Sequence, residues 1–303
     1  MFQYITSDTL PSSETLSRYC LANPDFLLDV AETSKNSLSD ALGDKFSLVM
    51  FDLRMGGAWK RTRRGRLKET ERALSKYLAS GNRQGIALLD IGASDGITTW
   101  EAVQALRQSL GVETQAWLAD LYLYLLRYRN GLFVEYRAGD GEPVLARLGR
   151  IGLRLSKQRR EVKEQADALT QFYLGLAGLR EKMKLDARIP LIHPLAQSDA
   201  AITAIELNCL DRDPNLVGKF NAVRASNVLN HGYFTPAQIG TAVSHLHAYL
   251  RDGGVLVISR NNDVDGGEIE CGSVWLRRAG HFEKVEEFGN GSEVREIVDA
   301  WRQ

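Results

Sequence analysis

The 303-residue sequence has few cysteines, no net charge and no long apolar run. Its three cysteines, Cys20, Cys209 and Cys271, stand at spacings that suit neither a disulfide framework nor a metal site, which favours a reducing compartment. Lys and Arg number 38, as do Asp and Glu, so no overall field would attract nucleic acid. No segment approaches the about 20 apolar residues that span a bilayer, and the N-terminus lacks a signal-peptide pattern. These absences predict a soluble, cytoplasmic protein without a bound metal.

What is present is most informative at residues 88–99, LLDIGASDGITT. The apolar run 86–91 predicts a parallel strand covered on both faces. Gly92 and Gly96 predict a tight turn in which backbone passes close to a ligand, and helical apolar spacing begins at Thr98. Strand, glycine turn and helix together form the geometry by which an open α/β sheet holds a nucleotide-like ligand.

The pattern Asp90-x-Gly92-x-x-x-Gly96 resembles motif I of class I S-adenosylmethionine-dependent methyltransferases, with Ser94 where a middle glycine is often found. It departs from the G-x-G-x-x-G dinucleotide fingerprint. The resemblance implies S-adenosyl-L-methionine as cofactor, with its amino-acid portion held by the loop. The residues that this implication assigns to the loop are Asp90, Gly92, Ala93, Ser94 and Gly96. Without the resemblance, Asp90 could equally be a helix-capping residue.

Two further strands carry polar residues at their ends. Residues 113–120 predict a second strand, and the resemblance gives Asp120 the ribose hydroxyls, since a carboxylate accepts from two vicinal hydroxyls. The alternative for Asp120 is an ordinary aspartate in a turn. Residues 202–207 predict a third strand, after which the resemblance assigns the adenine amino group to Asn208 or to Asp211.

The C-terminal third completes the resemblance. Residues 220–231 predict a fourth strand and its loop, and Thr235-Pro236 predict a helix start that leads to about residue 250. Residues 255–259 predict a fifth strand, and residues 269–288 an antiparallel hairpin, as this family has. The predicted fold is therefore α/β, with a Rossmann-like, mostly parallel seven-stranded sheet that ends in a hairpin.

The loop after the fourth strand faces the transferred methyl group in related enzymes, and here it contains Asn227, Asn230 and His231. An imidazole titrates near neutral pH, so His231 is the candidate general base for a hydroxyl acceptor. A surface histidine before a turn is the alternative. His193 is a second candidate base.

Two regions flank the predicted sheet. Residues 1–84 predict a helical N-terminal cap, and residues 85–303 a methyltransferase-like domain. The run 54–66 is basic and could approach an anionic substrate or be a solvated loop. About 80 residues separate the second and third strands, far more than a 2–6-residue connection, so we expect an insertion at about 130–188.

The insertion is expected to be helical and to act as a lid. Leu145, Leu148, Ile151 and Leu155 stand three or four apart, and basic residues flank them. A basic amphipathic helix over Arg147–Arg160 could contact a membrane or an anionic partner, or could pack on its own domain.

The sequence thus favours a methyltransferase acting on an oxygen or nitrogen of a small or medium-sized acceptor that it does not identify, without nucleic acid. One alternative is a protein carboxyl methyltransferase, because the helical N-terminal region and residues 227–229 resemble the chemotaxis receptor methyltransferases. The other is a non-catalytic scaffold docked by its basic helix. The oligomeric state is open.

Overall fold

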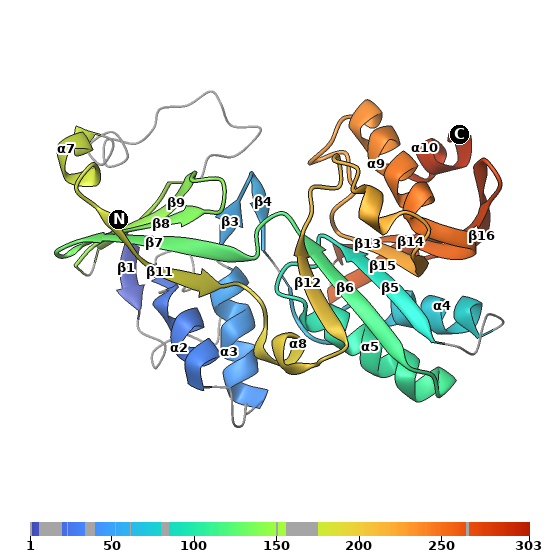
Figure 1. Cartoon of the computed structure of the whole chain (residues 1–303), viewed down its shortest axis with the longest axis horizontal. Helices are drawn as coiled ribbons and strands as arrows, with labels where there is room; N and C mark the ends of the chain where they lie inside the picture. Colours follow the sequence, from blue (N-terminus) through green and yellow to red (C-terminus); the bar gives the residue numbers. More distant parts are fainter. Residues whose placement is uncertain are drawn as a thin grey trace. The chain divides into compact units, whose positions relative to one another are not determined.

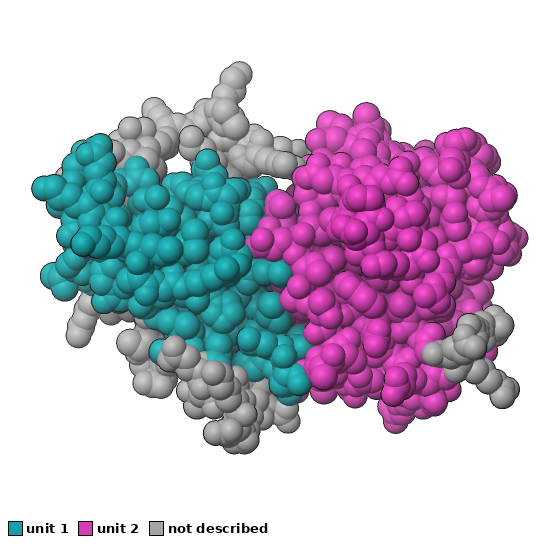
Figure 2. Space-filling view, viewed as in Figure 1, with its two compact units in different colours: residues 1–62, 122–198 teal, residues 63–121, 199–303 magenta. Residues whose placement is uncertain are grey.

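The computed structural model describes residues 2–5, 20–22, 24–33, 40–51, 53–60, 62–79, 85–149, 151–155, 175–264 and 267–303. The chain forms two compact units (Figure 2), of which unit 1 contains residues 1–62 and 122–198 and unit 2 contains residues 63–121 and 199–303. The predicted boundary at residue 84 is corrected to residue 62, because the helix before the first strand of the parallel sheet packs on that sheet.

Unit 2 contains the predicted seven-stranded sheet (Figure 1). In spatial order its strands are β12 (Ile202–Glu206), β6 (Thr114–Asp120), β5 (Ile86–Ile91), β13 (Phe220–Ser226), β14 (Leu250–Val264), β15 (Gly267–Arg278) and β16 (His281–Phe288). The first five are parallel, whereas β15 and β16 are antiparallel to their predecessors. The Rossmann-like sheet and the C-terminal hairpin are therefore confirmed.

The direction of strand addition reverses between β5 and β13. Numbered along the chain, the parallel strands lie in the order 3-2-1-4-5, which places a topological switch point at the carboxyl ends of β5 and β13. Ligands of open α/β sheets bind in the crevice outside such a point. The residues that follow β5 and β13 are therefore the candidates for ligand binding.

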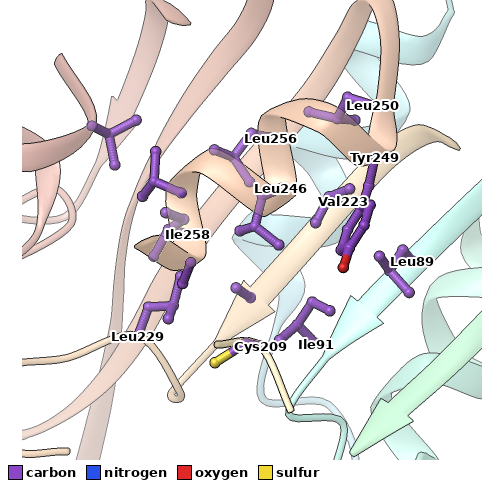
Figure 3. Packing of buried hydrophobic residues seen from close by; sticks show 14 of the residues in the cluster. Leu89, Ile91, Cys209, Val223, Leu229, Leu246, Tyr249, Leu250, Leu256 and Ile258 are labelled. Carbon is purple, nitrogen blue, oxygen red and sulfur yellow. The ribbon is translucent and has the colours of Figure 1, made fainter. Parts of the chain in front are cut away.

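Helices cover both faces of this sheet. Helices α4 (Lys68–Leu78) and α5 (Ile97–Leu110) bury Leu74 and Val103 against one face. Helices α9 (Pro236–Tyr249) and α10 (Arg295–Ala300) bury Leu246 and Val298 against the other. Figure 3 shows the second of these cores beneath α9. Such two-sided cover is what the continuous apolar run of β5 predicts.

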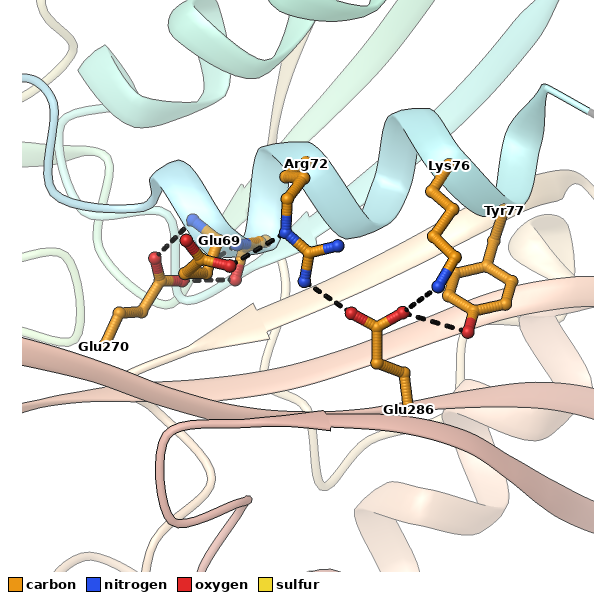
Figure 4. Close-up of polar contacts among 7 residues, drawn as sticks. Glu69, Arg72, Lys76, Tyr77, Glu270 and Glu286 are labelled. Carbon is orange, nitrogen blue, oxygen red and sulfur yellow. Dashed lines mark hydrogen bonds and ion pairs between the residues drawn. The ribbon is translucent and has the colours of Figure 1, made fainter.

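Two of these helices begin in different ways, α9 with a local cap and α4 with a distant one. Thr235 accepts a hydrogen bond from the Gln238 backbone N–H, and the Gln238 side chain accepts one from the Thr235 N–H, so α9 begins with a capping box and a proline. Helix α4 has no side-chain cap of its own. Instead, Glu270 of β15 accepts from the backbone N–H groups of Glu69 and Thr70 (Figure 4).

The rest of α4 is tied to the hairpin by charge. Glu286 of β16 binds Arg72, Lys76 and the Tyr77 hydroxyl (Figure 4). Burial would raise the pKa of Glu286, but hydrogen bonds from Lys76 and Arg72 lower it to about 2. This carboxylate is thus ionised throughout the neutral range, and it holds α4 to the end of the sheet.

Unit 1 is a second sheet with two helices on one face. Its strands, in spatial order, are β11 (Lys184–Pro190), β7 (Tyr124–Asn130), β8 (Phe133–Ala138), β9 (Pro143–Leu148), β10 (Ile151–Arg154), β1 (Phe2–Ile5) and β2 (Cys20–Ala22). Helices α2 (Asp25–Thr33) and α3 (Asp40–Phe51) bury Leu27 and Phe46 on it. The remaining elements are the hairpin of β3 (Arg54–Met55) with β4 (Ala58–Trp59), the short helices α7 (Ala177–Arg180) and α8 (Pro194–Ser198), and the 3-10 turn Pro214–Leu216 of unit 2.

The predicted helical insertion is wrong over most of its described part, where residues 143–148 and 151–154 form two antiparallel strands, and only the short α7 is helical. Gly149, with φ +59°, opens the two-residue turn between them. Arg147, on a strand, lies beside Asp25. No basic helix exists over the described residues of the range Arg147–Arg160, and residues 156–174 lie outside the description.

The N-terminal region is mixed rather than helical throughout. Helices α2, α3 and α4 confirm part of the prediction, but β1 to β4 also belong to this region. Within the predicted helical cap, residues 6–19 lie outside the description and Cys20 begins β2. Within the described ranges, no helix is long and apolar enough to cross a membrane.

Candidate functional site at the switch point of unit 2

The loop after β5 approaches the loop after β13 so closely that a glycine is required. Gly92 has φ +69°, and a Cβ placed there would lie 2.7 Å from the Cβ of Val228. Gly96, with φ +79°, then begins α5. Both glycines of the predicted motif therefore have conformations that L side chains rarely adopt.

We predict that Gly92→Ala destabilises unit 2 by about 1–3 kcal/mol, because the added methyl overpacks the contact with Val228. Urea unfolding of both proteins measures this. Gly111→Ala is the matched control, since Gly111 has φ +65° but no described atom lies within 4 Å of the position that its added methyl would occupy. Equal losses in the two variants would show that backbone strain, and not the contact with Val228, sets the cost.

The same loop is tied to the end of β6. The Gly92 and Ala93 N–H groups donate to the Ala119 carbonyl, at N–O distances of 2.8 and 3.2 Å. The Ser94 N–H donates to Asp120 Oδ2 at 2.8 Å, and Ser94 takes the left-handed φ of +60° to do so. Asp120 is 7% exposed. The structure thus brings together the loop and the strand-end acid that the sequence separates by 26 residues.

Asp90 has contacts that the sequence did not predict. Its Oδ1 accepts from Arg224 Nε at 2.9 Å, and its Oδ2 accepts from Thr99 Oγ1 at 2.5 Å and from Arg224 Nη2. Arg224 is on β13, beside β5, and is fully buried. Both oxygens of Asp90 are therefore engaged within the protein, and we interpret Asp90 as a residue that positions the loop rather than one that touches a ligand.

The charge of Asp90 stabilises the charged form of the Arg224 guanidinium. Burial alone would lower the pKa of Arg224, but the charge and hydrogen bonds of Asp90 raise it. The guanidinium is thus charged at every pH at which the protein folds. Arg224 Nη2 also lies 3.3 Å from Thr98 Oγ1, so one side chain joins β13, β5 and the first turn of α5.

The asparagines after β13 shape their own loop. Asn227, with φ +61°, exchanges side-chain contacts with Asn261 of β14, whose backbone N–H donates to Asn227 Oδ1 at 2.8 Å. Asn230 Oδ1 accepts from the Tyr233 N–H at 3.0 Å, and its Nδ2 donates to the Val228 carbonyl. These contacts make both amides builders of the loop, and their predicted catalytic role stays a prediction.

The candidate base lies on the same loop. His231 is exposed, and its backbone N–H donates to Glu293 Oε1 at 2.8 Å. His193 is completely buried in unit 1, where its Nδ1 accepts from the Leu195 N–H and its Nε2 lies 3.3 Å from the Gly43 carbonyl. The prediction of His193 as a second candidate base is therefore corrected, because its imidazole has a structural place in the core of unit 1. His231 keeps its candidacy.

The turn after β12 holds the two residues predicted for adenine. Asn208 Nδ2 donates to Asp211 Oδ2 at 3.1 Å, and Asn208 Oδ1 accepts from the Leu210 N–H. The neighbouring Leu207 N–H donates to the Asp120 carbonyl at 3.0 Å. Asn208 and Asp211 therefore lie near the end of β6, and their role toward a ligand stays a prediction.

The sequence singled out the basic segment that precedes α4, but it did not predict the contacts of this segment within unit 2. The Gly65 N–H donates to both carboxylate oxygens of Glu101, at 2.9 and 3.0 Å. Asn261 Nδ2 donates to the Arg66 carbonyl at 3.0 Å, which links this segment to Asn227. Of the basic run, Arg63 pairs with Glu268, whereas Arg61 lies outside the description. In the described ranges, no group of three His, Cys, Asp or Glu side chains could hold a metal ion.

No family model and no curated protein matches this chain. Similar solved structures include the CurJ carbon methyltransferase, at 15% identity and a TM-score of 0.34, covering 80% of this chain and 40% of that one. A SAM-dependent methyltransferase from Aquifex aeolicus has 11% identity and a TM-score of 0.32, covering 68% of this chain and 72% of that one.

A putative Zn-dependent alcohol dehydrogenase from Rhodobacter sphaeroides is similar to the same extent, with 14% identity, a TM-score of 0.32, and coverage of 64% of this chain and 47% of that one. The chain spans 35% to 54% of the length of the first four such structures. By its own strand order and glycine loop, unit 2 is a Rossmann-like α/β domain with a candidate ligand site at its switch point.

Proposed function

We propose that unit 2 binds S-adenosyl-L-methionine and that the protein is a methyltransferase acting on an oxygen or nitrogen of a small or medium-sized acceptor. The observation that carries the proposal is the contact of the glycine loop with Asp120 at the switch point. This contact fixes a close backbone approach beside a carboxylate, and a carboxylate is suited to a ribose diol.

The residues present fit such a donor. Because Gly92 has no Cβ, Val228 packs directly against the glycine loop and fixes the loop beside Asp120. The Ser94 N–H orients Asp120, whose carboxylate would accept hydrogen bonds from the ribose hydroxyls. Asn208 and Asp211, beyond the end of β6, would hold the adenine. When bound, the donor supplies an activated methyl group on a sulfonium.

The protein's own contribution would then be alignment and proton removal. Aligning two reactants accounts for a large share of the barrier in such a displacement. Asn227 and Asn230 fix the loop on which His231 stands. In this proposal the His231 imidazole accepts the proton of a hydroxyl acceptor as the methyl group transfers.

The competing proposals differ in their support. A scaffold docked by a basic helix loses its basis where residues 143–148 and 151–154 are strands. The protein carboxyl methyltransferase remains an alternative acceptor class for the same donor site. Labelling of a protein band by radioactive donor, rather than of small molecules, would favour it.

The proposed donor is tested by isothermal titration of the full chain with S-adenosylmethionine and S-adenosylhomocysteine. NAD is the control ligand, because domains of the Rossmann type also bind dinucleotides. We expect both sulfur ligands to bind with dissociation constants of about 1 μM, near −8 kcal/mol, and NAD to bind far more weakly. Binding of NAD with no response to either sulfur ligand would overturn the proposal.

A further inference from the structure

A buried polar cluster lies between the sheet of unit 2 and helices α4 and α5. Arg224 binds Asp90 and Thr98 through Nε and Nη2. Its Nη1 is buried and has no hydrogen-bond partner among the described residues. Buried polar groups are almost always paired, so this nitrogen calls for a physical explanation.

A carboxylate oxygen in this cluster is likewise buried and without a hydrogen-bond partner among the described residues. It is Oε1 of Glu71, on α4. After burial, the charge of Arg224 has the largest influence on Glu71, and Glu71 in turn acts on Arg224. Helix α4 packs on β13, so the third guanidinium nitrogen of Arg224 and the carboxylate of Glu71 belong to the same buried region, where no direct hydrogen bond joins them.

The Arg224 guanidinium interacts with different elements on its two sides. On one side it holds Asp90 at the end of β5 and Thr98 in the first turn of α5, and Thr99 also binds Asp90. These residues bracket the loop 92–96, so the position of Arg224 determines how firmly the loop is held. On the other side, the charges of Glu71 on α4 and Glu270 on β15 act on the guanidinium.

We infer that Arg224 is the positioning residue of the glycine loop, and that the Glu71 carboxylate, when ionised, steadies the guanidinium from the side opposite Asp90. The loop should then bind its ligand best with Glu71 charged. This inference rests on the proposed function for the identity of that ligand, but not for the coupling between Glu71 and the loop.

Burial, together with the charges around Glu71, places its titration near neutral pH. Burial raises the pKa of Glu71 to about 7, against the attraction of Arg224. This value includes the charges of Glu101 on α5 and Glu270 on β15, which raise the pKa, and that of Lys68 on α4, which lowers it. Burial also raises the pKa values of Glu101 and Glu270. The charge of Arg224 thus acts on the carboxyl groups of Glu71, Glu101 and Glu270, and Glu71 changes charge near pH 7.

The raised pKa of Glu71 means that its ionised form, which we expect to favour ligand binding, is the less stable form of the folded protein. A carboxyl with a raised pKa in the folded state stabilises the fold at low pH, and that contribution is lost as the pH rises through about 7. Glu71→Gln, which cannot ionise, should therefore raise the melting temperature at pH 8. We nevertheless expect this more stable variant to bind ligand less well.

The experiment compares wild type, Glu71→Gln and the control Glu69→Gln, whose side chain is half exposed on the same turn. Titration with S-adenosylhomocysteine is run at pH 6 and pH 8, with melting temperatures at both. We expect wild-type affinity to rise about fivefold from pH 6 to pH 8, and Glu71→Gln to keep the weak value at both. Glu69→Gln should follow the wild type.

Hydrogen exchange of residues 92–99 without ligand, at pH 8, is the second readout. We expect faster exchange in Glu71→Gln than in the wild type, despite its higher melting temperature. Unchanged exchange and unchanged affinity would overturn the inference and leave Glu71 with a purely structural part. If the wild type binds no S-adenosylhomocysteine at either pH, the proposed function fails, and exchange alone decides the inference.

Discussion

Asp120→Ala is expected to weaken the binding of S-adenosylhomocysteine on the order of 100-fold. The variant removes the proposed acceptor for two ribose hydroxyls, and each hydrogen bond to a charged group contributes about 1.5–3 kcal/mol. It also removes the acceptor of the Ser94 N–H, at 2.8 Å, and so loosens the loop itself. Isothermal titration of wild type and variant at one pH measures the change.

The matched control for Asp120 is Glu206→Ala. Glu206 is an exposed acid at the end of β12, directly across the parallel ladder from Asp120. Its removal changes the charge at the same edge of the sheet by the same amount, without touching the loop. Equal affinity of Asp120→Ala and wild type would remove the ribose assignment, and equal losses in both variants would show a general effect of charge.

Arg224→Met is expected to cost about 3–5 kcal/mol of unfolding free energy, because breaking one partner of a buried ion pair leaves the other charge uncompensated. Methionine fills much of the space, but it leaves the Asp90 carboxylate buried, 2% exposed, without its cation. Urea unfolding, followed by a probe within unit 2, measures the loss.

The double variant Arg224→Met with Asp90→Asn separates charge from shape. The asparagine oxygen still accepts from Thr99 Oγ1, which lies 2.5 Å from Asp90 Oδ2 in the wild type. We expect the double variant to recover most of the lost stability, because no unpaired charge remains. A single variant that loses less than about 1 kcal/mol would contradict the interpretation of this pair as a structural clamp.

The switch-point region was predictable because its residues allow few alternatives. A short apolar run, an acid and two glycines at 92 and 96 specify a covered strand and a tight turn, and β5 spans the predicted residues 86–91. Thr235-Pro236 likewise specified the start of α9. What these residues bind stays a prediction, since no ligand contact follows from strand order alone.

Arg224 was within reach of the same reasoning. It stands between Val223 and Ala225 in an otherwise apolar stretch, and a cation there requires a buried anion. The neighbouring parallel strand places Asp90 directly beside it. Considering the two strands together would have predicted the pair, and with it an indirect role for Asp90.

The prediction for the insertion failed because one spacing fits two structures. Leu145 and Leu148 are three residues apart, as on one face of a helix. Val144, Ala146 and Leu148 are two residues apart, as on one face of a strand. The deciding signals were the two-residue turns at Gly131 and Gly149, both with positive φ. Glycine at the first position of such a turn is typical of a hairpin.

The way the two units share the chain affects how the protein is made. The chain passes between units at residues 62, 121 and 198, so neither unit is one continuous stretch. When residue 198 has been synthesised, every described strand of unit 1 exists, but one edge of β5 must wait for β13, which begins at Phe220. During that interval a largely apolar strand has one unpaired edge. A nascent chain arrested at about this point would therefore be the form most prone to aggregate and most dependent on a chaperone.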